Sequence, residues 1–379
     1  MSFFQSLAAA FKGGASSRVP LARTFASPWL YGEGSARAPF EYNQAVKRAY
    51  LDNPVAQRAV RLVAEGIGGA PLAPCDPALA ALLGATSAGQ SLLETLASQL
   101  LLHGNAYVQV VKDGAGLPVE LYALRPERVS VVVGADGWPA AYAYKVGERN
   151  LTIPVLDEDA SPNLIHIKGF HPADDHYGAG CLAAADQAVA THNAAAGWNR
   201  MLLENAARPS GALVYDPGDG QGLSAEQFDR LKEELAQAYS GHGNAGRPML
   251  LEGGLKWQAL SLTPADMDFA ALKAAAARDI ALAFGVPPML LGLPGDATYA
   301  NYREANRALW RLTLLPLAGK ILAALGEGLT TWFPEAGLAI DLDRVPALSE
   351  DRERLWTQVG GAAFLSDAEK RALLGLATS

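Results

Sequence analysis

The chain has few of the residues from which compact reactive sites are built. Its 379 residues include two cysteines, Cys75 and Cys181, which lie far apart and form neither a Cys-x-x-Cys pair nor a zinc-ligand spacing. The sequence lacks the Gly-x-x-x-x-Gly-Lys-Ser/Thr phosphate loop and the Gly-x-Ser-x-Gly nucleophile motif. We therefore expect two buried thiols in a reducing compartment, and these absences exclude the commonest nucleotide-hydrolysing and serine-hydrolase sites.

Long apolar runs and an excess of basic charge are also missing. No uninterrupted apolar run reaches the roughly 18 residues that span a bilayer, and no basic residue precedes the short apolar patch at the start. We therefore expect a cytoplasmic chain with neither a membrane span nor a signal peptide. The 31 basic and 39 acidic residues give a net charge of −8, the wrong sign for ordinary DNA binding. Half of the residues are apolar, which excludes a largely disordered chain.

The stretch from Arg278 to Leu325 has the clearest local organisation. An apolar helix stops at Gly285, and two prolines directly after it prevent its continuation. An irregular loop follows over Met289–Thr298. A second helix begins near Tyr299, and Pro316 within it predicts a kink.

The preceding chain changes from a helical period to a strand period near His103. Helices are predicted over Asn43–Ile67, Pro77–Leu83 and Ser91–His103, and a mostly antiparallel sheet follows. An alanine-rich helix is then expected over Leu182–Asn205. A strand at 208–215, a helix capped by Ser224 with Gln227, a hairpin over 247–262 and a helix over Ala265–Phe284 are expected next. The last expected elements are a strand with Asp341 and Asp343 on one face, a helix from Glu350 to about Val359, and a helix capped by Ser366 with Glu369.

Several motifs occur in an order that points to one family. GNAYV, LYALRPERV and GWPAAYAYKV precede FGVPPMLLG and TYANYREANRALWRLTLLPL. From about residue 40 onward this order resembles the portal proteins of tailed double-stranded DNA phages, which form the ring at one capsid vertex through which DNA enters and leaves. One run departs from the family's pattern. YGAGCL has Gly180-Cys181 where Ser-Pro is commoner, which affects local turn geometry rather than the assignment.

The resemblance implies an α+β portal fold with an α/β wing, a helical stem, a small α/β clip and a short helical crown. The implied layout is a flexible arm over residues 1–38, a wing over 39–181, a stem helix over 182–207, a clip over 208–262, a second stem helix over 263–285, a tunnel-loop candidate over 286–300, a kinked helix and return strand of the wing over 301–345, and the crown over 346–379.

The resemblance also implies the partners. They are further copies of the chain in a ring, normally a dodecamer, double-stranded DNA in its channel, the terminase large subunit, a head–tail adaptor and the major capsid protein. No cofactor, metal, membrane or enzymatic activity is implied, and the place is a capsid vertex of a virion or virus-like particle. An acidic chain suits a conduit, because a basic lumen would hold DNA through many phosphate contacts. The short crown and the composition favour a gene transfer agent.

The candidate site residues belong to the tunnel loop and the clip. The loop candidates are Met289, Leu290, Leu291, Leu293, Pro294 and Gly295, which either line the channel or fill the core between two helices. The clip candidates for partner contacts are Phe228, Leu231 and Trp257. In the clip helix, Phe228, Leu231 and Leu235 are also expected to pack against the flanking strands.

Two alternatives remain open. His166, His171, Asp174, Asp175 and His176 lie within eleven residues and could form the metal site of a hydrolase, although a polar loop fits their spacing better. A monomeric adaptor or scaffold protein is the other alternative. A separate ambiguity concerns the basic residues Lys273, Arg278, Arg303, Arg307 and Arg311, which either approach DNA or form salt bridges along helix surfaces.

Overall fold

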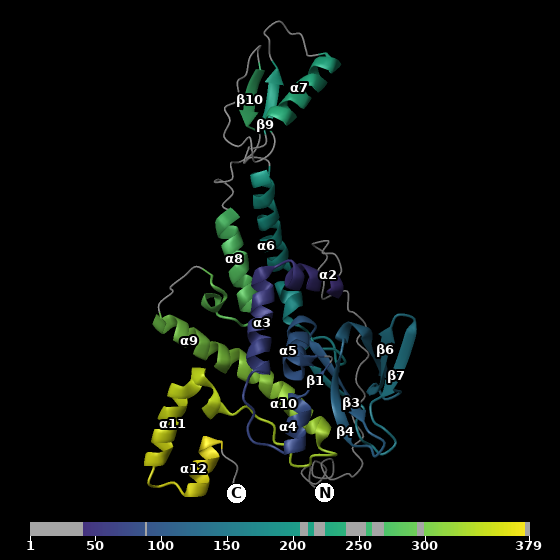
Figure 1. Cartoon of the computed structure of the whole chain (residues 1–379), viewed down its shortest axis with the longest axis vertical. Coiled ribbons are helices and arrows are strands. Elements are labelled where there is room, and N and C mark those ends of the chain that lie inside the picture. Colours follow the sequence, from purple (N-terminus) through teal and green to yellow (C-terminus); the bar gives the residue numbers. More distant parts are fainter. Residues whose placement is uncertain are drawn as a thin grey trace, which may run out of the picture. The chain divides into compact units, whose positions relative to one another are not determined.

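The computed structural model describes residues 41–87, 89–204, 211–215, 224–239, 255–259, 269–293 and 299–375. These residues form helices and antiparallel sheets (Figure 1), as expected of an α+β chain. The chain divides into two compact units. Unit 1 comprises Met1–Tyr42, Val63–Cys181 and Leu314–Ser379, and unit 2 comprises Asn43–Leu62 and Leu182–Thr313. Residues 43–62, expected in the wing, therefore group with the alanine-rich helix.

Unit 1 is built on two three-stranded antiparallel sheets. The first has the order β4–β3–β8 and the second β5–β6–β7. Their strands are β3 (Asn105–Lys112), β4 (Pro118–Leu124), β5 (Val129–Val133), β6 (Pro139–Val146), β7 (Arg149–Pro154) and β8 (Leu164–Lys168). One core joins the two sheets, because each strand contributes one buried side chain to it: Tyr107, Leu124, Val129, Tyr142, Ile153 and Leu164.

Helices cover the first sheet. α4 (Pro77–Gly84) and α5 (Leu92–Leu102) precede it, and the short strands β1 (Thr86–Ser87) and β2 (Gln90–Ser91) lie between them. α5 contacts β3 and β4, and α10 (Leu315–Leu329) contacts β8 and α5. A Cβ at Gly328 of α10 would lie 2.5 Å from the Ile165 side chain, so a glycine allows α10 to approach β8 this closely.

Four glycines form a backbone contact, here called the glycine junction, at Gly104, Gly169, Gly178 and Gly180. Gly104 has a φ of 82°, and a Cβ there would overlap the backbone of Ala179. The Gly169 amide donates to the Gly104 carbonyl at 2.7 Å. The buried Asn105 side chain accepts from the Gly178 amide at 2.7 Å and lies 3.2 Å from the Gly178 carbonyl as a donor. The motifs GNAYV and YGAG therefore meet at this junction.

Polar contacts fasten the helices of unit 2. α2 (Tyr42–Val46) and the π-helix η2 (Lys47–Leu51) lead to α3 (Pro54–Gly68). The buried Asn53 caps α3 by accepting from the amides of Val55 and Ala56, each at 3.0 Å. The same side chain donates to Asn193 of α6 (Cys181–Glu204) at 2.8 Å and lies 3.1 Å from His192. We call this arrangement the Asn53 clamp.

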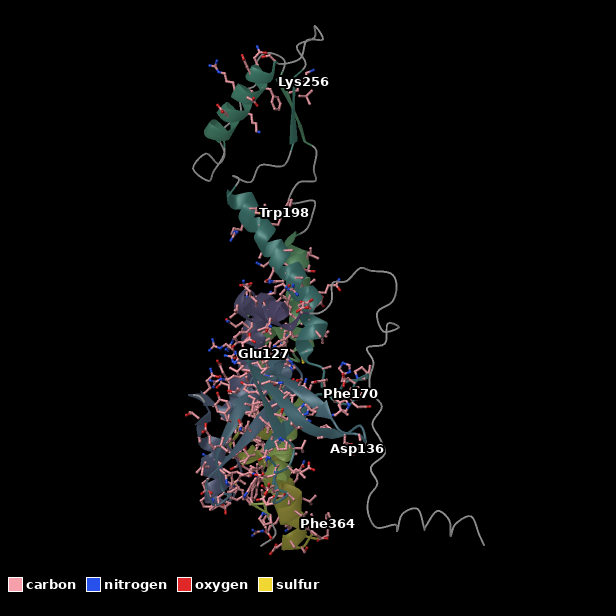
Figure 2. The ribbon with its side chains drawn as sticks, turned by 90° about the vertical axis from the view of Figure 1, so that its right-hand side faces the viewer. Glu127, Asp136, Phe170, Trp198, Lys256 and Phe364 are labelled. Carbon is pink, nitrogen blue, oxygen red and sulfur yellow. The ribbon has the colours of Figure 1, made fainter. Side chains whose placement is uncertain are left out.

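The buried stripe of α6 includes a polar residue. Its first half buries Leu182, Ala185, Val189, His192 and Ala195, which follow one another at helical spacing. Burial of His192 against Asn53 completes a stripe that apolar residues alone do not form. Farther along, none of the described side chains from Ala196 to Met201 is buried, and Trp198, labelled in Figure 2, is 41% exposed.

The helix with Pro316 deforms where the sequence predicts a kink. α9 (Tyr299–Leu309) runs into the π-helix η6 (Trp310–Leu314), and α10 follows. Pro316 has no amide proton, so the Leu312 carbonyl has no α-helical donor, and a wider turn accommodates this loss. The extra residue shifts the helical phase. Leu314 is buried and Leu312 is 77% exposed, so Leu312 does not lie on the buried face of the helix.

The same helix passes a length and composition test for crossing a membrane. Over Ala300–Leu329 it spans 30 residues, and its most apolar window has a mean hydropathy of 1.5. The expectation that no segment qualifies rested on uninterrupted runs, and this helix includes charged residues such as Arg303 and Lys320. Core helices of proteins without membrane spans pass the same test, and α10 buries Ile321, Leu322, Leu325 and Leu329 in unit 1.

The C-terminal part of unit 1 consists of short helices. The strand expected at Asp341 and Asp343 is wrong, because only an isolated bridge joins Ile340 to Leu72. The Asp341 carboxylate instead accepts from the Asp343 amide at 3.1 Å and begins η7 (Leu342–Arg344). The elements η8 (Pro346–Leu348), α11 (Ser349–Gly361) and α12 (Asp367–Leu374) follow. The predicted capping box of Ser366 and Glu369 is confirmed.

The described part of the expected clip contains two paired strands and a helix. β9 (Gly211–Tyr215) pairs with β10 (Leu255–Ala259), and α7 (Ala225–Tyr239) begins with the predicted capping box of Ser224 and Gln227. Phe228 is 57% exposed, so its expected burial is wrong for the single chain. Leu231 is partly buried. The side chains of Leu235 and Trp257, like the arm over 1–38, lie outside the described residues.

The glycine junction generates a test with a matched control. Gly104 and Gly116 have nearly the same φ, 82° and 80°, but only a Cβ at Gly104 would meet backbone atoms. Gly116→Ala should cost about 1–2 kcal/mol for its left-handed backbone. Gly104→Ala should cost about 4 kcal/mol or more, because the junction must open. Denaturant unfolding measures both, and equal losses would show that the close approach is unimportant.

Candidate functional site

The predicted helix–loop–helix stretch lies within unit 2 as far as Thr313. α8 (Phe269–Ala283) is followed by Gly285. Its φ of 65° lies in the left-handed region, which glycine adopts without a steric penalty. Phe284 and Val286 on either side of it are buried. Thr313 donates its hydroxyl to the Gly285 carbonyl at 2.6 Å, and a Cβ at Gly285 would lie 2.8 Å from that hydroxyl. The end of α8 is therefore fastened to η6.

The first part of the loop is a 3-10 turn rather than irregular chain. η5 (Pro288–Leu291) contacts both α8 and α9 and ends at Gly292, which has a φ of 72°. The side chains of Met289, Leu290, Leu291 and Leu293 are all partly buried, and none is fully buried. In the single chain they therefore do not fill a closed core between the two helices. Pro294 and Gly295 lie outside the described residues, and channel lining by this loop stays a prediction.

An apolar groove of about 530 Å³ lies at the base of this loop. Its walls come from the end of α8, from Pro287 and Pro288, and from Ala308, Leu312 and Thr313 on the opposing helix. Leu282 and Leu312 line it and are 79% and 77% exposed. The sequence pattern does not indicate that Leu282 and Leu312 share one surface, because only the phase shift at η6 brings Leu312 to it.

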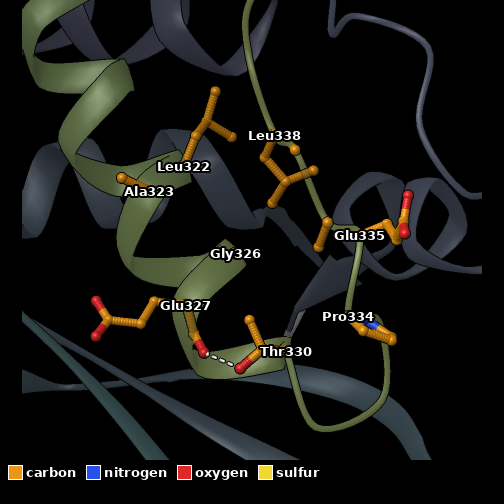
Figure 3. A pocket seen from close by; sticks show the side chains of 10 residues that line it. Leu322, Ala323, Gly326, Glu327, Thr330, Pro334, Glu335 and Leu338 are labelled. Carbon is orange, nitrogen blue, oxygen red and sulfur yellow. Dashed lines mark hydrogen bonds between the residues drawn. The ribbon is translucent and has the colours of Figure 1, made fainter. Parts of the chain in front are cut away.

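A second cavity lies in unit 1 between α10 and residues 334–338 and has a volume of about 370 Å³. Figure 3 shows its small walls at Ala323 and Gly326 and two carboxylates, Glu327 and Glu335, which point in different directions. Thr330 donates to the Glu327 carbonyl at 2.8 Å. The two acids do not form a pair suited to general acid–base chemistry.

The predicted basic residues do not share one environment. Arg307 has a mostly buried side chain and pairs with Glu304 at 3.0 Å, one helical turn away. The salt-bridge interpretation therefore holds for Arg307. Arg278, Arg303 and Arg311 lie at the exposed surface of their helices, whereas Lys273 is partly buried.

The predicted histidine cluster is dispersed into structural roles. The His166 Nε2 lies 3.0 Å from the side-chain amide oxygen Oδ1 of Asn105, and the ring stacks on Tyr107 with ring centroids 4.3 Å apart. Burial, followed by the charge of Lys168, lowers the pKa of the His166 imidazole to about 3. His171 accepts from the Ala173 amide at 3.1 Å, so its ring closes a local turn.

The two aspartates complete the same loop. The Asp174 carboxylate accepts from the amides of His176 and Tyr177 at 2.7 and 3.0 Å, and the Asp175 carbonyl accepts from Lys168. Among the residues that the structure describes, no three His, Cys, Asp or Glu side chains gather to hold a metal. The metal-hydrolase alternative built on His166–His176 therefore loses its ligand set.

A family model decides the assignment. The model of the phage portal protein matches residues 54–375. The chain belongs to the phage portal protein family. An uncharacterized protein of Rickettsia felis is 39% identical over 342 residues, which are 86% of this chain and 88% of that protein. The probable portal protein of Streptomyces phage phiC31 is 28% identical and covers 60% of this chain and 50% of that protein.

The structure is also similar to a chain of a gene transfer agent. In the neck of a native particle computed with C12 symmetry, that chain is 48% identical to this portal protein and has a TM-score of 0.68. The match covers 91% of this chain and 97% of that chain. The predicted family and the portal fold are thereby confirmed.

The buried His166 predicts a pH dependence of stability. Its folded pKa lies below the unfolded value, so the folded state resists protonation. The contribution of the neutral His166 to the free energy of unfolding is fully present above about pH 6.5 and is lost as pH falls toward about 3. From pH 7 to pH 5, protonation of His166 in the unfolded state should lower the free energy of unfolding by about 2 kcal/mol. Burial also lowers the pKa values of His103 and His192, so these two residues add to the loss.

Denaturant unfolding of the wild type and His166→Gln, at pH 7 and pH 5, measures this dependence. Gln keeps a side-chain donor toward Asn105 but does not titrate, so its stability should fall by about 2 kcal/mol less than that of the wild type. An equal fall in both proteins would contradict the assignment to His166.

Proposed function

We propose that this portal protein assembles into a closed ring of about twelve copies and that the ring is the channel for DNA packaging and ejection at one vertex of a particle. The observation that carries the proposal is the similarity to a chain, 48% identical, in a particle neck computed with C12 symmetry. The match covers nearly the whole of that chain, so the same surfaces are available to assemble. The particle is proposed to be of the gene transfer agent kind, built in a bacterial cytoplasm.

The charge of the chain suits a conduit for DNA. A net charge of −8 per copy makes the ring strongly acidic, so DNA in its channel forms few lasting phosphate contacts. The loop beyond Gly285 adds uncharged apolar side chains that are partly buried. We place this loop, over residues 286–300, at the channel wall, where it contacts DNA without gripping the phosphates.

The clip is proposed to contact the protein partners. Phe228 is 57% exposed on α7, and a large exposed aromatic side chain is a common anchor of protein interfaces. With Leu231 and Trp257 it would contact the terminase large subunit during packaging and the head–tail adaptor afterwards. The wing would contact the major capsid protein. A monomeric adaptor remains the second candidate, and it differs from the ring in mass.

Assembly tests the proposal directly. Light scattering and negative-stain images of the purified chain, alone and with capsid proteins of the same particle, should show rings of about twelve times the 39.8 kDa chain. A chain that stays monomeric at every concentration and with those partners present would overturn the ring and favour the adaptor.

Shortening the loop separates its structural role from a role in the channel. Deletion of Pro294–Asp296 should leave rings intact, because Gly285, Thr313 and η5 fasten the base of the loop. Particles built on the shortened ring should contain less DNA, measured as nuclease-protected DNA per particle. Loss of rings would make the loop structural, and normal DNA content would remove it from the channel wall.

A further inference from the structure

The groove at the base of the loop contains the two most exposed leucines of the described chain. Leu282 and Leu312 have exposed fractions of 79% and 77%, whereas the next leucine, Leu51, has 68%. They come from α8 and η6 and line one cavity of about 530 Å³. Two such residues on one concave surface indicate a binding site rather than scattered apolar exposure.

The chemistry of the groove favours a protein occupant. Its walls are Pro287, Pro288 and Ala308 besides the two leucines, and its charges, on Arg278 and Asp279, have opposite signs. Such a surface offers DNA phosphates no net attraction. The groove is also preformed, because Thr313 holds the Gly285 carbonyl at 2.6 Å. An apolar protein surface is therefore the matching partner.

Among its described residues, unit 2 buries few large side chains, and this helps to identify the partner. Among the twelve largest fully buried side chains of the described residues, only Leu182, Ile280 and Phe284 belong to unit 2. Its other buried residues are mainly alanines, and the Asn53 clamp supplies polar contacts on the side of α6. The side of α8 and α9 has the open groove instead. A unit of this kind gains its missing apolar contacts from a neighbour.

We infer that the groove binds a second copy of this chain and is one face of the contact between neighbours in the ring. The inference rests on the proposed ring and adds which surface closes it. In a cyclic ring each copy offers two different surfaces, and the groove is the concave one. Because Pro287 and Pro288 form part of it, the neighbour also fixes where the channel loop leaves α8. Ring closure and loop position are thus coupled.

Three variants test the contact: Leu282→Gln, Leu312→Gln and, as the matched control, Leu151→Gln. Leu151 is 55% exposed on β7 of unit 1, outside the groove. All three positions are exposed, so the melting temperature of the single chain should stay unchanged. Each groove variant should raise the concentration for half-assembly, measured by mass photometry, by about tenfold or more, since burial of one leucine is worth that factor. The control should assemble like the wild type.

A photo-crosslink identifies the occupant. A benzoylphenylalanine at position 282, in a mixture of ¹⁵N-labelled and unlabelled chains, should give crosslinked peptides that join a heavy and a light copy. Crosslinks confined to one chain, for instance to residues 294–298, would make the chain's own loop the occupant and overturn the inference. High salt should leave the rings intact, because apolar burial drives the contact. Dissociation by salt counts against the groove.

The outcomes also separate this inference from the proposed function. If the wild type forms rings but the groove variants assemble as readily as Leu151→Gln, the ring stands and the groove is not its contact. If the wild type forms no rings under any condition, the proposed function fails and the inference fails with it.

Discussion

The backbone contact at the glycine junction is the constraint on which unit 1 depends. Gly104 directly precedes β3, Gly169 follows β8, and Gly178 and Gly180 precede α6, so two segments far apart in sequence, at residues 104 and 169–180, share one crowded point. The contact requires that none of these residues has a side chain. The buried Asn105 then satisfies the Gly178 peptide and orients His166.

This arrangement explains why the histidine and aspartate side chains of the loop do not gather at one point among the described residues. The side chains of His171 and Asp174 accept hydrogen bonds from backbone amides within the loop, and glycine contacts fix its ends. A metal site needs several side chains that converge on one point. Here the Asp174 carboxylate accepts from the amides of His176 and Tyr177, and the His166 ring packs against the rings of Tyr107 and Tyr142. Residue spacing alone does not distinguish these arrangements, because both place the same residue types close together in sequence.

Local sequence signals predicted most of the elements and the caps. The ends of α3, α5 and α8, and the capping boxes at Ser224 and Ser366, follow from residues within one or two turns. Long-range effects were not predictable in this way. The π-turn before Pro316 changes which side of a helix is buried, and the buried His192 extends the face of α6 through contact with Asn53. The strand expected at Asp341 failed because capping of η7 competes with extended pairing.

The two units differ in what holds them together, and the difference bears on function. Unit 1 has paired sheets and most of the large fully buried side chains of the described residues. Unit 2 combines small buried residues, polar contacts and an open apolar groove next to the loop. If that groove is filled only by a neighbour, the loop takes its final position only in the ring. The surface proposed to meet DNA would then exist only in the assembled channel, and a free chain would have no strong DNA-binding site to occupy.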